Sequence, residues 1–192
     1  VSVHKTGGSL TQSAMLLMGK GVNADYVRQV INLTQTTSAS YLLMVSLDLA
    51  RQNLALHGRE FYAKTVEFAE YARKEINALG GYYAFGEELC NGRDFFAFDK
   101  TKLSVHTRAM GLAGIEVYEL LRDEYDIQIE FGDIGNILAI ITGGDRALEI
   151  ERLVSALSEI KRLYGRSPVG LYDHEYINPN VVLPPQTIGR AS

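Results

Sequence analysis

The chain has 192 residues, of which 46% are hydrophobic and 22% are charged, enough for one fair-sized core or two small ones and too apolar for a disordered protein. Its 19 basic and 23 acidic residues give a net charge of −4. The sequence has no basic block of the kind that binds nucleic acids or anionic membranes. A single cysteine, Cys90, excludes an intrachain disulfide, and no apolar run reaches the roughly 18 residues of a membrane span. We therefore expect a cytoplasmic globular protein with neither a nucleic-acid nor a membrane partner.

The first eight residues, VSVHKTGG, place hydroxyl, imidazole, amine and glycine groups close together. Hydroxyls, imidazole N–H groups and backbone amides donate to phosphate oxygens, and a lysine amine with a lowered pKa attacks carbonyls. The P-loop alternative fails, because Lys5 precedes Gly7 and Gly8 instead of following them. Without further context, an ordinary surface lysine beside a glycine turn is commoner than a reactive lysine at a phosphate site. The chain opens on this segment without an initiator methionine, so we expect an N-terminal part to be missing.

The next elements are predicted from apolar spacing and glycine breaks. Residues 13–18, SAMLLM, form a short apolar run that predicts a buried strand. Asn23 is a suitable N-cap for a first helix, and Ser38 or Ser40 is a suitable cap for a second. A break is expected at Gly58, within the sequence LALHG.

A long helix is predicted after this break, over residues 58–80, and we expect it to link two domains. Gly80 and Gly81 end it, and one apolar stripe marks it, made of Phe61, Thr65, Phe68, Ala72, Ile76 and Leu79.

The sequence then changes to strands with helices on one face, which predicts an α+β domain over residues 81–164. In chain order we expect a strand at 102–107, a helix at 115–121, strands at 127–130 and 137–141, and a helix at 147–163. All four prolines lie in residues 165–192, which are expected to form an irregular tail.

Several segments carry a family resemblance in the same order along the chain. Ser2-Val3-His4-Lys5 is followed by LTQSA, and TTSASY occupies residues 36–41, with Ala39 where proline is usual. The later segments are DKTKL at 99–103, the turn at 111–114, LRDEY at 121–125, IQIE at 127–130 with Asp133, and Gly144-Asp145. Over residues 1–164 the chain resembles the bacterial ornithine/lysine/arginine decarboxylases, and most closely their shorter Gram-positive type. These are pyridoxal-phosphate (PLP) enzymes.

The resemblance implies an α/β fold of the aspartate-aminotransferase type (PLP fold type I), with residues 1–57 as the last part of the PLP-binding large domain. It implies that Lys5 and His4 are catalytic, with pyridoxal 5'-phosphate held by Lys5 as a Schiff base. Ser2 and His4 would contact the cofactor phosphate. Thr37 or Ser38 would reach the phosphate or substrate of the neighbouring subunit in a homodimer or larger homo-oligomer.

The implied reaction is that of a lyase: α-decarboxylation of arginine, lysine or ornithine, with release of carbon dioxide and a polyamine precursor. Glu130 and Asp133 are candidates for holding the distal cation of the substrate, although solvated loop carboxylates are commoner. Arg108 is assigned a structural role, and no metal site is expected. The family's ring-nitrogen aspartate and ring-stacking aromatic residue would precede Val1, so the 192-residue chain alone is expected to be inactive.

Two alternatives stay open. The chain could be a non-catalytic structural or interaction subunit that completes an active site on another chain, and a companion chain with the missing part would support this. It could also be another enzyme of the same fold, such as an aminotransferase, which an assay of carbon dioxide release against amino transfer would distinguish.

Overall fold

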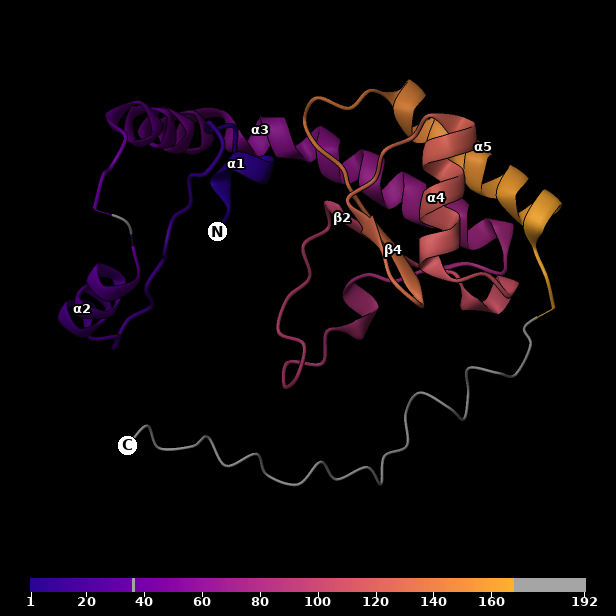
Figure 1. The fold of residues 1–192 in the computed structure, drawn as a ribbon, viewed down its shortest axis with the longest axis horizontal. Coiled ribbons are helices and arrows are strands. Elements are labelled where there is room, and N and C mark those ends of the chain that lie inside the picture. Colours follow the sequence, from indigo (N-terminus) through magenta and orange to yellow (C-terminus); the bar gives the residue numbers. More distant parts are fainter. Residues whose placement is uncertain (36, 168–192) are drawn as a thin grey trace. The chain divides into compact units, whose positions relative to one another are not determined.

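The structure, a computed structural model, describes residues 1–35 and 37–167 (Figure 1). Its contacts divide the chain into two units. The first unit comprises Val1–Glu67 and Thr142–Asp145, and the second comprises Phe68–Ile141 and the residues from Arg146 onward. Helix α3 (Tyr41–Leu79) belongs to both, and the division falls inside the segment predicted as a linking helix. Most of the predicted tail lies outside the described residues.

Side-chain caps mark the starts of two helices in the first unit, α2 and α3. This unit contains α1 (Val3–Thr6), α2 (Ala24–Thr34) and the N-terminal part of α3. The Asn23 side chain accepts hydrogen bonds from the amides of Asp25 and Tyr26 at 3.0 and 3.1 Å, which confirms the predicted N-cap. At α3 the cap is Ser40, whose hydroxyl accepts from the amide of Leu43 at 3.5 Å.

The predicted buried strand at residues 13–18 is wrong. The segment has no regular secondary structure, and Leu16, Leu17 and Met18 are 63%, 73% and 50% exposed. A buried strand needs neighbouring strands on its edges and cover on its faces. Among residues 1–35 and 37–167, the strands that pair all lie at residue 83 or later.

The predicted break at Gly58 is also wrong, because α3 is one helix of 39 residues. A glycine inside a helix costs about 1 kcal/mol relative to alanine, which a long helix tolerates. Gly58 meets only ordinary contacts, with a Cβ at this position lying 3.7 Å from the Leu54 side chain.

The second unit is an antiparallel sheet with helices packed on one face (Figure 1). Its strand order is β1-β2-β4-β3, and the strands are β1 (Tyr83–Ala84), β2 (Lys102–His106), β3 (Phe131–Gly132) and β4 (Asn136–Ile140). The helices are α4 (Gly114–Tyr125) and α5 (Ala147–Tyr164), with short 3₁₀ turns at Glu87–Leu89 and Arg108–Met110. The strand predicted at 127–130 lies a few residues later, although the amide of Glu130 already donates to the carbonyl of Leu138.

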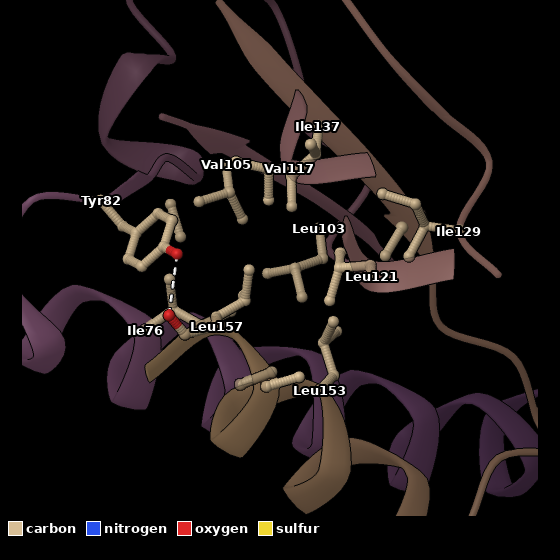
Figure 2. Packing of buried hydrophobic residues seen from close by; sticks show 14 of the residues in the cluster. Ile76, Tyr82, Leu103, Val105, Val117, Leu121, Ile129, Ile137, Leu153 and Leu157 are labelled. Carbon is tan, nitrogen blue, oxygen red and sulfur yellow. Dashed lines mark hydrogen bonds between the residues drawn. The ribbon is translucent and has the colours of Figure 1, made fainter. Parts of the chain in front are cut away.

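The core lies between the sheet, α4, α5 and the C-terminal part of α3 (Figure 2). In β2 every second residue is buried, and these are Leu103 and Val105. The phenol of Tyr82 donates to the carbonyl of Leu157 at 2.8 Å, and burial raises the pKa of this phenol well above its usual value. The helices contribute Ala72, Ile76, Val117, Leu121, Ile150, Leu153, Leu157 and Ile160.

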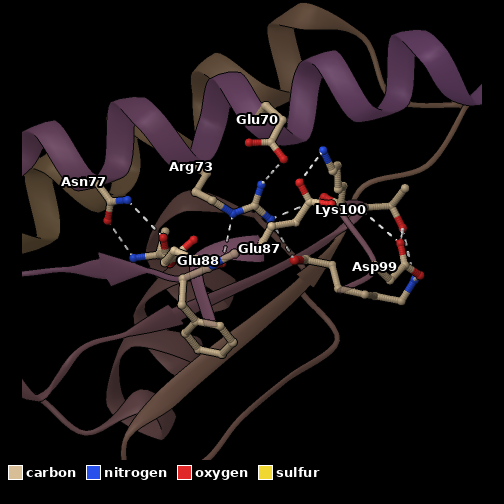
Figure 3. A network of polar contacts seen from close by, with 12 residues as sticks. Glu70, Arg73, Asn77, Glu87, Glu88, Asp99 and Lys100 are labelled. Carbon is tan, nitrogen blue, oxygen red and sulfur yellow. Dashed lines mark hydrogen bonds and ion pairs between the residues drawn. The ribbon is translucent and has the colours of Figure 1, made fainter. Parts of the chain in front are cut away.

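A buried arginine joins α3 to the connection between β1 and β2 (Figure 3). Arg73 is 6% exposed, and its Nε donates to the carbonyl of Phe85 at 2.9 Å. Its Nη2 donates to the carbonyls of Lys100 and Lys102 at 3.3 and 3.1 Å. Its Nη1 lies 2.9 Å from the Glu70 carboxylate. One side chain therefore fixes both ends of this long connection.

Candidate functional site

The candidate site begins in α1, which carries Lys5 on an exposed position. Ser2 occupies the N-cap, but its side chain makes no capping hydrogen bond. Gly7 ends the helix, and a Cβ at this residue would lie 2.5 Å from a methyl group of Val3. Only glycine allows the chain to turn this closely beside Val3, which is buried.

His4 is oriented by the segment that follows the glycines. Its Nδ1 lies 2.8 Å from the carbonyl oxygen of Ser13, and since a carbonyl only accepts, Nδ1 carries the proton. Nε2 is left as the second polar atom of the ring. Ser13 is 6% exposed, and its hydroxyl donates to the carbonyl of Leu10 at 2.7 Å and lies 2.5 Å from the hydroxyl of Ser9.

Helix α3 supports the same segment at two points. The phenol of Tyr62 donates to the carbonyl of Thr6 at 2.5 Å, directly after Lys5. The hydroxyl of Ser46 accepts from the amide of Leu10 at 3.2 Å. Tyr62 was not predicted from the sequence, because its contact with Thr6 depends on the spatial path of a helix far along the chain.

The predicted loop residues Thr37 and Ser38 are exposed and lie between α2 and α3. Thr36, which begins the TTSASY motif, lies outside the described residues. The contacts described above join His4 to Ser13, and α1 to Tyr62.

The two candidate substrate carboxylates lie in the second unit. Glu130 is exposed next to β3. Asp133 has a structural task in the β3–β4 turn, where its Oδ1 accepts from the amides of Gly135 and Asn136 at 2.7 Å each. An Asp two residues before a Gly is a common turn signal, so this role was visible in the sequence.

Among residues 1–35 and 37–167, no group of three or more His, Cys, Asp and Glu side chains is arranged to hold a metal ion. Over the same residues, none of the helices combines the length and the apolar character needed to cross a membrane.

A sequence model described as "Orn/Lys/Arg decarboxylase, major domain" matches residues 1–107. The chain belongs to the Orn/Lys/Arg decarboxylase family. This confirms the family inferred from the motifs, and the matched range includes α1, α2 and α3.

Two relatives in this decarboxylase family are arginine decarboxylases. That of Halalkalibacterium halodurans is 42% identical over 177 residues, which cover 89% of this chain and 36% of that protein. That of Bacillus subtilis is 39% identical over 183 residues, which cover 95% of this chain and 37% of that protein. The chain therefore spans little more than a third of the length of these relatives.

Two solved structures share the fold. The lysine decarboxylase of Francisella novicida superposes with a TM-score of 0.65 over 84% of this chain and 27% of that chain. The constitutive lysine decarboxylase of E. coli gives a TM-score of 0.53 over 74% of this chain and 25% of that chain. Both are 21% identical in sequence, so this likeness concerns the mixed helix and sheet fold alone.

Proposed function

We propose that this chain is the lysine-bearing part of a pyridoxal-phosphate-dependent decarboxylase of basic amino acids, built on PLP fold type I and working in the cytoplasm. The observation that carries the proposal is the setting of Lys5, within the range that the family model matches. Lys5 occupies an exposed position on α1. The carbonyl of the next residue, Thr6, is held by Tyr62, and the ring of the preceding residue, His4, is held by the carbonyl of Ser13. A lysine between two fixed neighbours suits covalent attachment of an aldehyde cofactor.

The donors around Lys5 fit the phosphate of such a cofactor. The Ser2 hydroxyl is not engaged in capping α1 and can donate. Nδ1 of His4 donates to the carbonyl of Ser13, so Nε2 can donate to a phosphate only in the doubly protonated imidazolium form of the ring. Ser2 and His4 would hold the phosphate, and Lys5 would bind the aldehyde carbon. Thr37 or Ser38 would donate to the phosphate or substrate of the neighbouring subunit in a homodimer, which the exposure of this loop permits.

Bound pyridoxal phosphate supplies an electron sink for the pair released when carbon dioxide leaves the α-carbon of the substrate. Lys5 would yield its place to the substrate amine and then deliver a proton to that carbon, giving a diamine or agmatine. Glu130 or Asp133 would pair with the distal cation of arginine, lysine or ornithine. The Oδ1 atom of Asp133 also accepts two backbone amides in the β3–β4 turn.

The attachment site can be tested by incubating the chain with excess pyridoxal phosphate, reducing with borohydride and mapping the labelled peptide. We expect the pyridoxyl group on Lys5. The substitution Lys5→Ala should remove most of the label, whereas Lys20→Ala, at another exposed lysine, should keep it. A label that stays on Lys20 or Lys102 after Lys5→Ala would contradict the assignment. Measuring carbon dioxide release against amino transfer in the assembled enzyme would separate a decarboxylase from an aminotransferase.

A second candidate, a non-catalytic interaction subunit, is favoured by the exposed apolar residues Leu16, Leu17 and Leu33. The activity of the assembled enzyme with Lys5→Ala distinguishes the two candidates. If the chain is only an interaction subunit, Lys5→Ala leaves the activity of the assembled enzyme unchanged. If Lys5 is catalytic, that substitution abolishes it.

A further inference from the structure

Helix α1 is a single helical turn whose C-terminal end needs a partner from elsewhere in the chain. It spans Val3–Thr6, and the amide of Gly7 closes it by donating to the carbonyl of Val3 at 2.7 Å. One helical turn fixes several backbone angles for very few hydrogen bonds, so it is unstable without tertiary contacts. The last carbonyls of a helix also lack partners within the helix, and the carbonyl of Thr6 is one of them.

Tyr62 supplies this partner. Its phenol donates to the carbonyl of Thr6 at 2.5 Å, and Figure 1 shows α1 beside α3. The ring of Tyr62 is half-buried and meets the ring of Phe61 edge to face, with 5.2 Å between the centroids. Tyr62 lies well inside the 39-residue α3, away from the ends where helices fray. The phenol is therefore held at a fixed point.

The helical turn of α1 keeps the amine and one phosphate donor close together. Ser2 and Lys5 are three residues apart, and such residues are neighbours on the surface of a helical turn. The amide of Lys5 donates to the carbonyl of Ser2 at 3.2 Å. In an extended segment the same two residues would lie about 10 Å apart. Unwinding α1 would therefore separate the amine from the hydroxyl.

We propose that Tyr62 is a positioning residue for the cofactor site. By holding the carbonyl of Thr6 it keeps α1 wound, so that Ser2 and Lys5 meet the phosphate and the aldehyde of the same pyridoxal phosphate molecule. This inference rests on the proposed function and deepens it by adding a residue of α3 to the site. Groups that are already in place when the ligand arrives bind it more tightly, because less freedom is lost on binding.

Tyr62 acts through the backbone of α1 and not on the cofactor itself. Its hydroxyl proton is donated to Thr6, so using that proton for transfer would first break the contact that holds α1. The competing explanation is a purely structural contact, which stabilises the first unit without favouring a phosphorylated ligand. The two explanations differ in whether the loss of the phenol changes the preference of Lys5 for an aldehyde that carries a phosphate.

The test compares pyridoxal phosphate with pyridoxal, which has the aldehyde but no phosphate. The 192-residue chain is incubated with a limiting amount of each, reduced with borohydride and mapped for label on Lys5 and Lys20. The phosphate preference of Lys5 is its label relative to Lys20 with pyridoxal phosphate, divided by the same ratio with pyridoxal. We expect this preference to fall about fivefold in Tyr62→Phe, the factor that corresponds to about 1 kcal/mol for one lost hydrogen bond.

Tyr71→Phe is the matched control, because it removes a phenol from the same helix. The phenol of Tyr71 donates to the Glu151 carboxylate at 2.6 Å, within the second unit. Its loss should leave the phosphate preference of Lys5 unchanged. Far-UV circular dichroism of both variants should match the unsubstituted chain, since each substitution removes a single hydroxyl.

An unchanged phosphate preference in Tyr62→Phe, or an equal loss in Tyr71→Phe, overturns the positioning role. So does a fall in Lys5 label that is the same for both aldehydes, or a general loss of helix, since Tyr62 is then a structural contact only. If Lys5 of the unsubstituted chain shows no phosphate preference, the proposed function is contradicted and the role of Tyr62 falls with it. A preference that is present and survives Tyr62→Phe contradicts the positioning role alone.

Discussion

At the scale of single residues, Arg73 combines a buried charge with a nearly complete set of partners. Its guanidinium donates to three backbone carbonyls and pairs with Glu70, and the ring of Phe98 lies 5.2 Å from it. Taking a charge out of water is costly unless its hydrogen bonds are replaced. Here they are replaced by carbonyls at both ends of the β1–β2 connection, so the guanidinium orders that connection.

We expect Arg73→Met, which keeps an apolar stem of similar length, to lower the free energy of unfolding by about 3 kcal/mol. The cause is the loss of the donor shared by the carbonyls of Phe85, Lys100 and Lys102. Urea unfolding measures the change. The control is Arg162→Met, at a side chain that is 67% exposed and pairs with Glu159, where we expect less than about 0.5 kcal/mol. Equal effects at the two positions would contradict the role assigned to Arg73.

The candidate site could be predicted only as far as it is contiguous in sequence. Ser2, His4 and Lys5 lie within four residues, so their chemistry was visible at once. The supports of this segment were not visible, because Tyr62 and Ser46 reach it from α3. No local pattern marks a side chain whose partner lies 56 residues away, as the partner of Tyr62 does.

At the scale of elements, the features predicted best from the sequence are those whose pattern lies within a single helix or strand. The alternation in β2 and the cap at Asn23 are local, and both predictions were confirmed. The strand predicted at residues 13–18 failed because a strand is defined by its partners, which a local pattern does not contain. The break at Gly58 failed because one glycine is a small cost within a long helix.

The start of α4 requires a glycine at residue 114. A Cβ at Gly114 would lie 2.0 Å from the carbonyl oxygen of Asn136 and 2.7 Å from that of Asp133. Both atoms belong to the backbone at or beside β4, so neither moves aside without disturbing the sheet. Glycine at this position therefore allows α4 to pack directly on the turn between β3 and β4.

We expect Gly114→Ala to lower the free energy of unfolding by about 2–3 kcal/mol, because overpacking forces α4 away from the sheet. Gly58→Ala is the matched control, since its new methyl group meets only ordinary contacts inside α3. That substitution should be neutral or stabilising by up to about 1 kcal/mol. Denaturant unfolding followed by far-UV circular dichroism compares the two. A loss at Gly58 as large as that at Gly114 would show that α3 is interrupted there after all.

At the scale of the whole molecule, the composition allowed one fair-sized core or two small ones, and the structure concentrates the core in the second unit. The first unit also contains many hydrophobic residues, but among its described residues Val3 and Ala50 are the buried ones. Burial of a leucine or valine side chain is worth about 1.5–3 kcal/mol. Exposed leucines of α2 and α3, such as Leu33, Leu42 and Leu49, gain little of this stabilisation. Stability should therefore differ sharply along the chain.

Helices α2 and α4 allow a direct comparison, because they have 11 and 12 residues but different surroundings. Helix α4 buries Val117 and Leu121, whereas α2 has no buried residue. An isolated helix of this length is marginal in water, since most helical stability in proteins comes from packing of an apolar face. Hydrogen exchange should report this difference.

In the chain alone, we expect amides of α2 to exchange with protection factors below about 100, and those of α4 and β2 with factors above about 1,000. Mass spectrometry of exchanged peptides measures both in one sample, so differences in pH or temperature cancel. If α2 is as protected as α4 in the chain alone, then α2 is stabilised without burying its apolar face.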